Sequence, residues 1–176
     1  MTRIYVAIDP GLYGAVAVVG HNGKFLGLFD TPITQIKRGK KNRRVYLAAS
    51  MAAIIRRVID KYKLQSIKVC LEQVNAMPGE GAVGAFTFGR GVGLWEGIAA
   101  GLGLPIESVT SQVWKKAILK KPGKDKGASI LKAQQLFPAA AEKLTRKRDD
   151  GRADALLIAE YFRRQAVGEH NGNISQ

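Results

Sequence analysis

The chain has 176 residues, 46% of them hydrophobic, which is enough for one sizeable buried core and too little to argue for two. Its 28 lysines and arginines outnumber 14 acidic residues, and the net charge of +14 points to a polyanionic partner. A basic protein with a solvated surface, or one that lies on anionic lipid, is the alternative. The single cysteine, Cys70, excludes an intrachain disulfide and thiolate-rich zinc sites, so we expect a reducing, cytoplasmic setting.

The first residues lack the apolar run and cleavage site of a signal peptide. Residues 91–106 are the most apolar stretch, but Glu96 interrupts them and they are shorter than the roughly 20 residues that a membrane-spanning helix needs. We therefore expect no membrane partner.

The N-terminal part of the chain has the pattern of a three-stranded meander. Residues 3–9 alternate between apolar and polar positions and end at Asp9-Pro10-Gly11, which is turn chemistry. Residues 15–19 and 25–29 are further strand candidates, joined by the hairpin signal Asn22-Gly23. Residues 35–44 are interpreted as a basic connection without apolar periodicity, and residues 47–62 have helical spacing.

The C-terminal part alternates helices and strands. Residues 66–72 and 104–109 are predicted strands, and a glycine-rich loop is expected from 77 to 90. Helices are expected over 113–119, 128–137 and about 151–165, with a basic loop before the second of these. This order predicts an α/β fold with a mixed five-stranded sheet, an antiparallel meander plus parallel strands, and helices on both faces. Residues 1–167 are expected to form one domain, and residues 168–176 a disordered tail.

Four acids are candidates for a metal site. Asp9 and Glu72 each lie at the end of a predicted strand, directly after its apolar run. Asp150 and Asp154 are four residues apart, so they share one face of a helix. Carboxylates this close need a cation between them, and oxygen-only ligands select Mg²⁺ or Mn²⁺. Two such ions per site can activate water and stabilise the leaving oxygen in phosphodiester cleavage.

Each acid also has a plainer interpretation. Asp9 before Pro-Gly is often only a turn former, and Asp149 is expected to be an N-cap of the last helix. Glu72 and Asp154 are harder to explain in this way, because core-like residues surround them and buried acids are rarely left unpaired. The four acids together are a stronger signal than any one of them.

Several motifs resemble those of the RuvC-type Holliday-junction resolvases, nucleases with an RNase H-like fold. They are I-D-P-G at 8–11, L-E-Q at 71–73 and G-R-A-D-A-L-L-I-A at 151–159. The resemblance is closer to the phage and plastid branch, through A-M-P-G-E-G at 76–81, V-W-K at 113–115 and K-R-D-D-G-R-A-D at 147–154. It covers residues 4 to about 165 and suggests a bacterial or phage-infected cell.

The resemblance implies a set of metal-binding catalytic residues, Asp9, Glu72, Asp150 and Asp154. Bacterial RuvC proteins carry the third acid three residues before the last, where this chain has Gly151. The phage and plastid pattern places an acid or histidine four residues before, which is Asp150, with Asp149 as its competitor. The resemblance also implies a homodimer, no nucleotide cofactor, and lysines near the scissile phosphate. For that role Lys115 and Lys126 are preferred over Lys116 and Lys124.

Basic and aromatic residues supply the candidate DNA contacts. In the expected loop, Phe86, Phe88 and Arg90 suit stacking on unpaired bases, although either phenylalanine alone could fill the core. The family resemblance adds Met77 and Glu80 to this set. The basic stretch is expected to grip duplex arms through phosphates, with a solvated loop or a nuclear-import signal as alternatives. Its residues are Lys37, Arg38, Lys40, Lys41, Arg43 and Arg44.

Three glycines recur at every fourth position, Gly93, Gly97 and Gly101, and would form one helix face. Since glycine is costly inside a helix, close approach of another element is the expected gain. That element is either a second subunit of the dimer or the sheet of the same subunit.

The leading hypothesis is a structure-selective endodeoxyribonuclease that resolves four-way DNA junctions by symmetric, metal-dependent nicking and leaves ligatable ends. The alternative is a non-catalytic branched-DNA-binding module on the same fold. That alternative has no need for four acids set against a polyanion. A kinase-like relative is disfavoured because the chain is too short for the two domains that enclose ATP.

Overall fold

The computed structural model describes residues 3–63, 67–75, 79, 81–119 and 127–168. Its main sheet has the strand order β3-β2-β1-β6-β7, formed by β1 (Ile4–Ile8), β2 (Ala15–Gly20), β3 (Phe25–Asp30), β6 (Ile67–Gln73) and β7 (Ile106–Thr110). The first three strands pair antiparallel, while β6 and β7 run parallel to β1. The expected mixed five-stranded sheet with a meander is confirmed.

The central strand β1 is buried on both faces, and this explains its composition. Ile4, Val6 and Ile8 belong to the core on one face, and Tyr5 and Ala7 to the core on the other. Because side chains alternate along a strand, one apolar run supplies both layers. The sheet is thus the shared wall of two hydrophobic cores.

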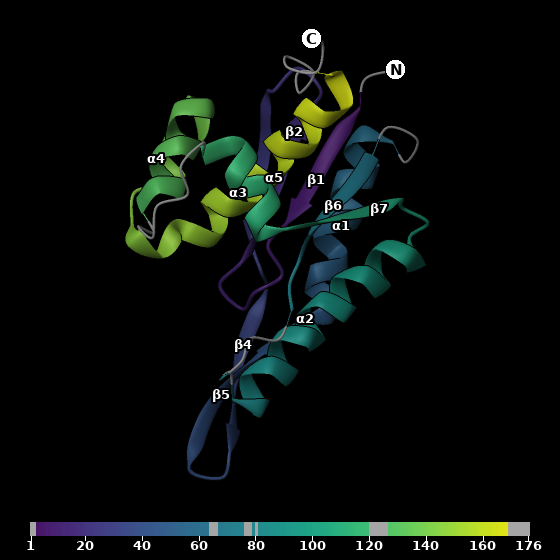
Figure 1. Cartoon of the computed structure of the whole chain (residues 1–176). Coiled ribbons are helices and arrows are strands. Elements are labelled where there is room, and N and C mark those ends of the chain that lie inside the picture. Colours follow the sequence, from purple (N-terminus) through teal and green to yellow (C-terminus); the bar gives the residue numbers. More distant parts are fainter. Residues whose placement is uncertain (1–2, 64–66, 76–78, 80, 120–126, 169–176) are drawn as a thin grey trace.

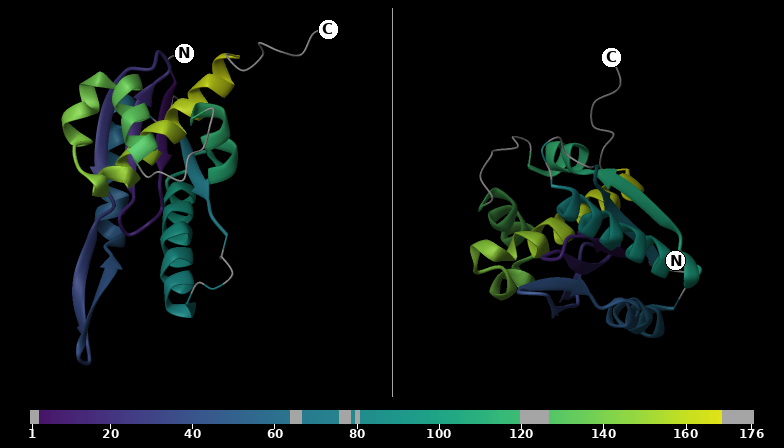
Figure 2. Two further views of the ribbon diagram at one scale, coloured as in Figure 1. Left: turned by 60° about the vertical axis from the view of Figure 1, so that its left-hand side comes forward. Right: turned by 90° about the horizontal axis from the view of Figure 1, so that it is seen from below.

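Helices cover both faces of this sheet, as Figures 1 and 2 show. On one side lie α1 (Ala48–Tyr62) and α2 (Ala82–Gly101), and their buried residues join the core of Ile4, Val6 and Ile8. On the other lie α3 (Ser111–Leu119), α4 (Gly127–Leu136), α5 (Asp150–Val167) and the 3₁₀ turns η2 (Pro138–Lys143) and η3 (Lys147–Asp149). The α5 helix contacts β1 and β2 and brings its first turn to the end of β1.

A two-stranded hairpin projects from the same end of the sheet as the N-terminal half of α2 (Figures 1 and 2). It consists of β4 (Ile33–Arg38) and β5 (Lys41–Tyr46). The interpretation of residues 35–44 as an irregular basic connection is therefore wrong. Gly39, at φ +61°, makes the tight turn, and the hairpin stays solvated on much of its surface, so its strands lack apolar alternation.

The glycine-rich segment also differs from expectation. The α2 helix begins at Ala82, so Phe86, Phe88 and Arg90 lie on a helix and not in a loop. Tertiary contact outweighs the helix cost of glycine: a Cβ on Gly91 would lie 2.4 Å from the Tyr46 hydroxyl oxygen and 2.7 Å from the Pro10 carbonyl oxygen. Gly91 thus allows α2 to approach the hairpin and the turn after β1.

The glycine face of α2 points away from the subunit's own core. Built Cβ atoms on Gly93, Gly97 and Gly101 would meet nothing within 4 Å, whereas Trp95 and Ala99 are the residues buried against the sheet. One of the two expectations for these glycines, that they pack on the sheet of the same subunit, is therefore wrong. The face is left open for another contact.

The remaining helices lie within a few residues of their expected positions. The basic loop at 120–126 and most of the tail expected from 168 onward are outside the described residues, while Gly168 ends α5 in the left-handed conformation. Among the helices that the structure describes, none is both long and apolar enough to cross a membrane.

Candidate active site

Asp9 lies at the centre of the site, in the turn that follows β1. Its backbone N–H donates to the Ala15 carbonyl oxygen over 3.0 Å, and its Oδ1 accepts from the Gly11 N–H over 3.1 Å. Burial, followed by the charge of Glu72, raises the pKa of Asp9 to about 7. The protein therefore holds this carboxyl where its ionised form is disfavoured.

Glu72 lies beside Asp9 because β1 and β6 pair in parallel, with Ile8 opposite Leu71. It is only 7% exposed, and its Oε1 accepts a 2.9 Å hydrogen bond from Trp114 Nε1 of α3. Burial raises the pKa of Glu72, while the Trp114 hydrogen bond opposes the rise. The indole fixes one oxygen of this carboxylate.

Asp154 approaches from the second turn of α5. Its Oδ2 lies 3.4 Å from Lys115 Nζ, and its Oδ1 is buried without a hydrogen-bond partner in the described structure. Burial raises the pKa of Asp154, and the charge of Lys115 lowers it in part. A buried oxygen without a partner is costly, so this atom is suited to a ligand.

Asp150, one turn earlier on α5, belongs to the same group electrostatically. Its charge contributes to the raised pKa values of both Asp9 and Asp154. Its Oδ1 accepts a local 3.1 Å hydrogen bond from the Gly151 N–H. Asp150 is half-buried at the helix start, and its charge acts on Asp9 and Asp154.

Asp149 is held elsewhere. It occupies the N-cap position of α5, but its side chain makes no capping hydrogen bond, so the expected capping role is wrong. Its carboxylate turns back to Arg146, accepting from the backbone N–H over 2.8 Å and from Nη2 over 2.7 Å. Burial would raise the pKa of Asp149, but the hydrogen bonds from Arg146 outweigh it and lower the pKa. Asp149 is thus neutralised by arginine, and Asp150 is the better candidate for the third acid.

Two glycines allow these elements to meet. A Cβ on Gly151 would lie 2.3 Å from the Tyr13 carbonyl oxygen and 3.1 Å from Asp9 Oδ2. A Cβ on Gly14 would lie 2.1 Å from the Asp9 carbonyl oxygen. The glycine in D-D-G-R-A-D is therefore explained by close approach of α5 to the turn that carries Asp9.

The chemistry of the four acids fits a hard divalent cation. They offer only oxygen donors, three of them have raised pKa values, and one buried oxygen has no partner in the described structure. As they stand, however, the described side chains include no group of three or more Asp, Glu, His or Cys that could hold an ion. The fit therefore rests on donor chemistry and charge.

Of the candidate lysines, the structure brings Lys115 to the acids. Lys116 is exposed on α3. Lys124 and Lys126 lie outside the described residues, as do Met77 and Glu80, so their expected roles stay predictions.

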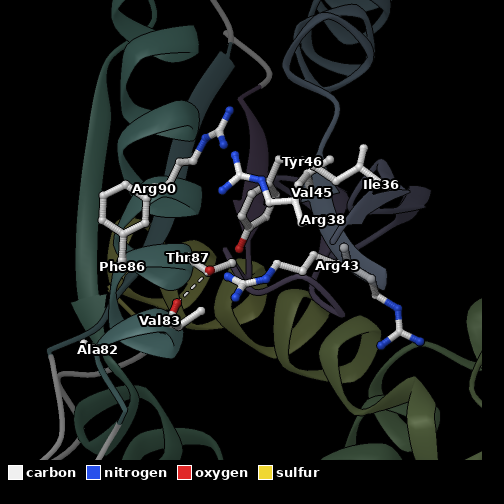
Figure 3. Close-up of a pocket in the computed structure, with 11 residues that line it drawn as sticks. Ile36, Arg38, Arg43, Val45, Tyr46, Ala82, Val83, Phe86, Thr87 and Arg90 are labelled. Carbon is white, nitrogen blue, oxygen red and sulfur yellow. Dashed lines mark hydrogen bonds between the residues drawn. The ribbon is translucent and has the colours of Figure 1, made fainter. Parts of the chain in front are cut away.

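The basic and aromatic candidates line a groove between the β4–β5 hairpin and α2, named here the hairpin–helix groove (Figure 3). It comprises two cavities of about 390 and 400 Å³ that share Arg43, Arg44, Tyr46, Val83 and Thr87. Arg38, Phe86 and Arg90 line the first, and Phe88 and Tyr13 the second. The other three candidate basic residues, Lys37, Lys40 and Lys41, are exposed on the hairpin.

The structure distinguishes the two phenylalanines. Phe86 is 75% exposed at the groove, whereas Phe88 is half-buried. A Cβ added to Gly11 would lie 3.7 Å from the Cε2 atom of Phe88. Phe88 therefore packs on the turn that carries Asp9. Filling of the core by Phe86, the alternative interpretation, is wrong for this residue.

Sequence reasoning missed three supporting contacts. The Trp114–Glu72 hydrogen bond joins residues 42 apart, and V-W-K was noticed only as a motif. Tyr46 donates a 3.2 Å hydrogen bond to the Pro10 carbonyl oxygen and so ties the hairpin to the turn after β1. Tyr13 contacts Arg44, whose guanidinium carbon lies 5.0 Å from the ring centroid. The last two contacts involve the β4–β5 hairpin, which was not predicted, so no sequence pattern pointed to them.

No family model matches the chain. It is 38% identical over 85 residues to "Holliday junction resolvase MOC1, chloroplastic" of Chlamydomonas reinhardtii, a match that covers 48% of this chain and 10% of that protein. The chain thus matches about a tenth of the length of this curated relative.

Two solved structures of RuvC from Thermus thermophilus are similar along nearly the whole chain. One, "in complex with Holliday junction substrate", has a TM-score of 0.58 at 17% identity and covers 93% of this chain and 96% of that one. The other has a TM-score of 0.55 at 17% identity, with 96% and 97% covered. The resemblance of the motifs to those of RuvC-type resolvases and their plastid branch is confirmed by these similarities. The chain has the RNase H-like fold of RuvC.

Proposed function

We propose that the chain is a divalent-metal-dependent endodeoxyribonuclease that resolves four-way DNA junctions by symmetric nicking. One observation carries the proposal: Asp9, Glu72, Asp150 and Asp154 interact through their charges at the end of β1, beside an arginine-lined groove. The likeness to a plastid Holliday junction resolvase and to RuvC bound to a junction supports the choice of substrate.

In this proposal the four acids hold the cations, Mg²⁺ or Mn²⁺, two per site. When bound, such ions activate water and neutralise charge on the phosphodiester. Trp114 holds Glu72 in a fixed orientation, and Asp154 Oδ1 offers a buried oxygen that has no other partner in the described structure. Lys115, 3.4 Å from Asp154, is close enough to offset negative charge on the phosphoryl oxygens.

We also propose that the enzyme is a homodimer, since resolving a junction requires one nick in each of two strands of like polarity. The open glycine face of α2, formed by Gly93, Gly97 and Gly101, supports a contact there, because small residues permit close approach of a partner helix. Light scattering should give a dimer mass for the wild type and a monomer mass for Gly97→Leu. A dimer mass for Gly97→Leu would show that the dimer contact does not lie at this face of α2.

We propose that residues 1–167 form the nuclease domain. We also propose a reducing compartment such as the cytoplasm, on the ground that Cys70 is the single cysteine and the chain therefore has no intrachain disulfide.

The test is a cleavage assay on a labelled four-way junction and a duplex of the same sequence, each with Mg²⁺ and with chelator. Paired nicks on the junction alone, only with metal, are expected. Junction binding without cleavage under every metal tested would favour the non-catalytic binding module. Equal cutting of the duplex and the junction would show that the nuclease does not select junctions.

A further inference from the structure

The first turn of α5 carries acids of the site but lacks a local anchor. Asp149, at the N-cap position, makes no capping hydrogen bond, because its carboxylate is turned back to Arg146. A helix start without a cap is less stable and frays more readily. Asp150 lies in this first turn and Asp154 one turn further on. The position of both carboxylates therefore depends on how the start of the helix is held.

Arg152 anchors this turn to distant parts of the chain. Its Nε and Nη2 atoms donate to the two carboxylate oxygens of Asp30, over 2.5 and 2.6 Å. Its Nη1 donates to the Lys143 carbonyl oxygen over 3.0 Å. Asp30 is the last residue of the edge strand β3, and Lys143 is the last residue of η2. One guanidinium thus ties the start of α5 both to the sheet and to the turn that precedes the helix.

The same guanidinium completes an ion network around Asp149. Arg152 Nη1 lies 3.6 Å from Asp149 Oδ1, and Arg146 Nη2 lies 2.7 Å from the same oxygen. Asp149 is only 2% exposed, so two arginines neutralise it inside the network. The network withholds Asp149 from a cation and leaves Asp150 as the acid of the first turn whose charge acts on Asp9.

Arg152 lies on the side of α5 opposite to the acids. At about 100° per residue, Asp150 and Asp154 are about 40° apart around the helix axis, and Arg152 is about 180° from the middle of that pair. Arg152 is therefore placed to act on them through the backbone of the first turn and not by contact. Between these two sides, Gly151 brings the helix against the Tyr13 carbonyl oxygen, where a Cβ would lie at 2.3 Å. Held at both points, the helix has a fixed rotation about its axis.

Folding stability alone does not explain this arrangement. The Asp30 side chain is 61% exposed, and an ion pair with an exposed partner adds little to stability. The planar guanidinium and the carboxylate nevertheless meet through two parallel hydrogen bonds, a geometry that fixes direction as well as distance. Such a contact is suited to orienting one element against another.

We propose that Arg152 is a positioning residue for the metal site: by bridging Asp30 and Asp149, it holds the first turn of α5 in the orientation in which the acids of that helix can bind a divalent cation. The inference rests on the proposed function, in which those acids bind the cation. Groups that orient metal ligands from behind typically contribute about 10- to 100-fold to metal affinity.

The test measures the affinity of the full chain for Mn²⁺, without DNA, from the electron paramagnetic resonance signal of the free ion. Asp30→Asn removes the charged partner of Arg152 on β3, outside the acid centre, and should weaken Mn²⁺ binding about tenfold. Arg152→Lys keeps the charge but cannot form both parallel hydrogen bonds, and should weaken binding to the same extent. The double variant should bind no more weakly than either single variant, because both changes remove one contact.

A matched control and two further measurements separate positioning from other effects. Arg164→Lys changes an ion-paired arginine in the last turn of the same helix and should keep the wild-type affinity for Mn²⁺. Melting temperatures in chelator should change little in any of these variants. Junction affinity in chelator should be retained, while the cleavage rate at limiting Mn²⁺ should fall in Arg152→Lys and Asp30→Asn.

Unchanged Mn²⁺ affinity in either Arg152→Lys or Asp30→Asn would overturn the proposal, and so would losses that add in the double variant. A lowered melting temperature with unchanged Mn²⁺ affinity would show that the bridge only stabilises the fold, which also overturns it.

The outcome for the proposed function is separate. A wild type that cuts junctions, with variants that bind Mn²⁺ normally, would keep the nuclease function and lose the positioning role of Arg152. A wild type that never cuts, with variants that show the tenfold losses, would keep the positioning role and lose the nuclease function. A wild type that binds no Mn²⁺ at saturating concentration would overturn both.

Discussion

The acid centre and the hairpin–helix groove lie side by side and are built in opposite ways. The acids are withdrawn from water, and the pKa values of Asp9, Glu72 and Asp154 are raised, so their ionised forms oppose folding. The groove is lined by exposed side chains, such as Phe86 and Arg90, that contribute little to the core. The core must hold the acids in place, whereas the exposed side chains of the groove can vary with little cost to stability; Tyr46 in its wall is buried in the core and is an exception.

This difference predicts that substitutions in the two regions have separable effects. Changes among the acids should abolish cleavage while leaving DNA binding intact and the stability in chelator unchanged or raised. Changes at the exposed side chains of the groove or the hairpin should alter binding without altering the melting temperature.

The largest expected effect is that of Asp154→Asn. Cleavage of a four-way junction should fall about a hundredfold or more, because a negative metal-ligand candidate is replaced by a neutral group. Junction affinity should be retained, and the melting temperature in chelator should be unchanged or raised, since burial disfavours the ionised carboxylate.

The matched control is Asp60→Asn, which removes an exposed carboxylate on α1 and should leave cleavage unchanged. An Asp154→Asn enzyme that cuts at near the wild-type rate would contradict the assignment.

A smaller loss is expected for Trp114→Phe. The ring stays in the core, but Glu72 loses the indole hydrogen bond that orients it, an interaction of about 1.5–3 kcal/mol when the acceptor is charged. The cleavage rate should fall about tenfold. Trp95→Phe tests packing alone, because Trp95 is equally buried and its Nε1 has no partner in the described structure. Equal losses in both variants would show that packing, not orientation of Glu72, is the cause.

The acid centre should also make stability depend on pH in an unusual direction. Asp9 has a folded pKa of about 7 against 3.8 in the unfolded chain, so between these values the folded state binds the extra proton. In chelator, the contribution of Asp9 to the unfolding free energy should fall as pH rises from about 4 to 7 and then level off.

Denaturant titrations of the wild type and Asp9→Asn across this range measure the effect. The dependence should be weaker in the variant, with the remainder due to Glu72 and Asp154, whose pKa values are also raised. Asp149 and Glu160 have lowered pKa values, so their contribution is lost only at more acidic pH. The same slope in both proteins would show that Asp9 is not withdrawn from water as described.

The smallest effect is expected at the hairpin turn. Removing both lysines, Lys40→Ala with Lys41→Ala, should weaken junction and duplex binding alike. The salt slope of log affinity should decrease by about two, because each lysine is expected to neutralise one phosphate. The melting temperature should not change, because both side chains are exposed. A weakening confined to the junction would place these lysines at the branch point instead.

The sheet and the acid set were predictable because both follow from local patterns. Alternation marked β1 and β6, an acid came directly after the apolar run of each, and the four-residue spacing of Asp150 and Asp154 put them on one helix face. The hairpin and the start of α2 were not predictable in this way. Charged, solvated strands lack alternation, and the helix over Gly91 depends on packing against Tyr46, a residue distant in sequence.

The choice between Asp149 and Asp150 likewise required the fold. Adjacent aspartates are equivalent in the sequence, and only the position of the Arg146 guanidinium shows which carboxylate is already neutralised.

The most direct test of the acid centre is anomalous diffraction from crystals of the protein soaked in Mn²⁺. We expect anomalous peaks among the carboxylates of Asp9, Glu72, Asp150 and Asp154, with the Arg146–Asp149 ion pair intact. Absence of a peak there at saturating Mn²⁺, or a peak on Asp149 with Arg146 displaced, would contradict the account.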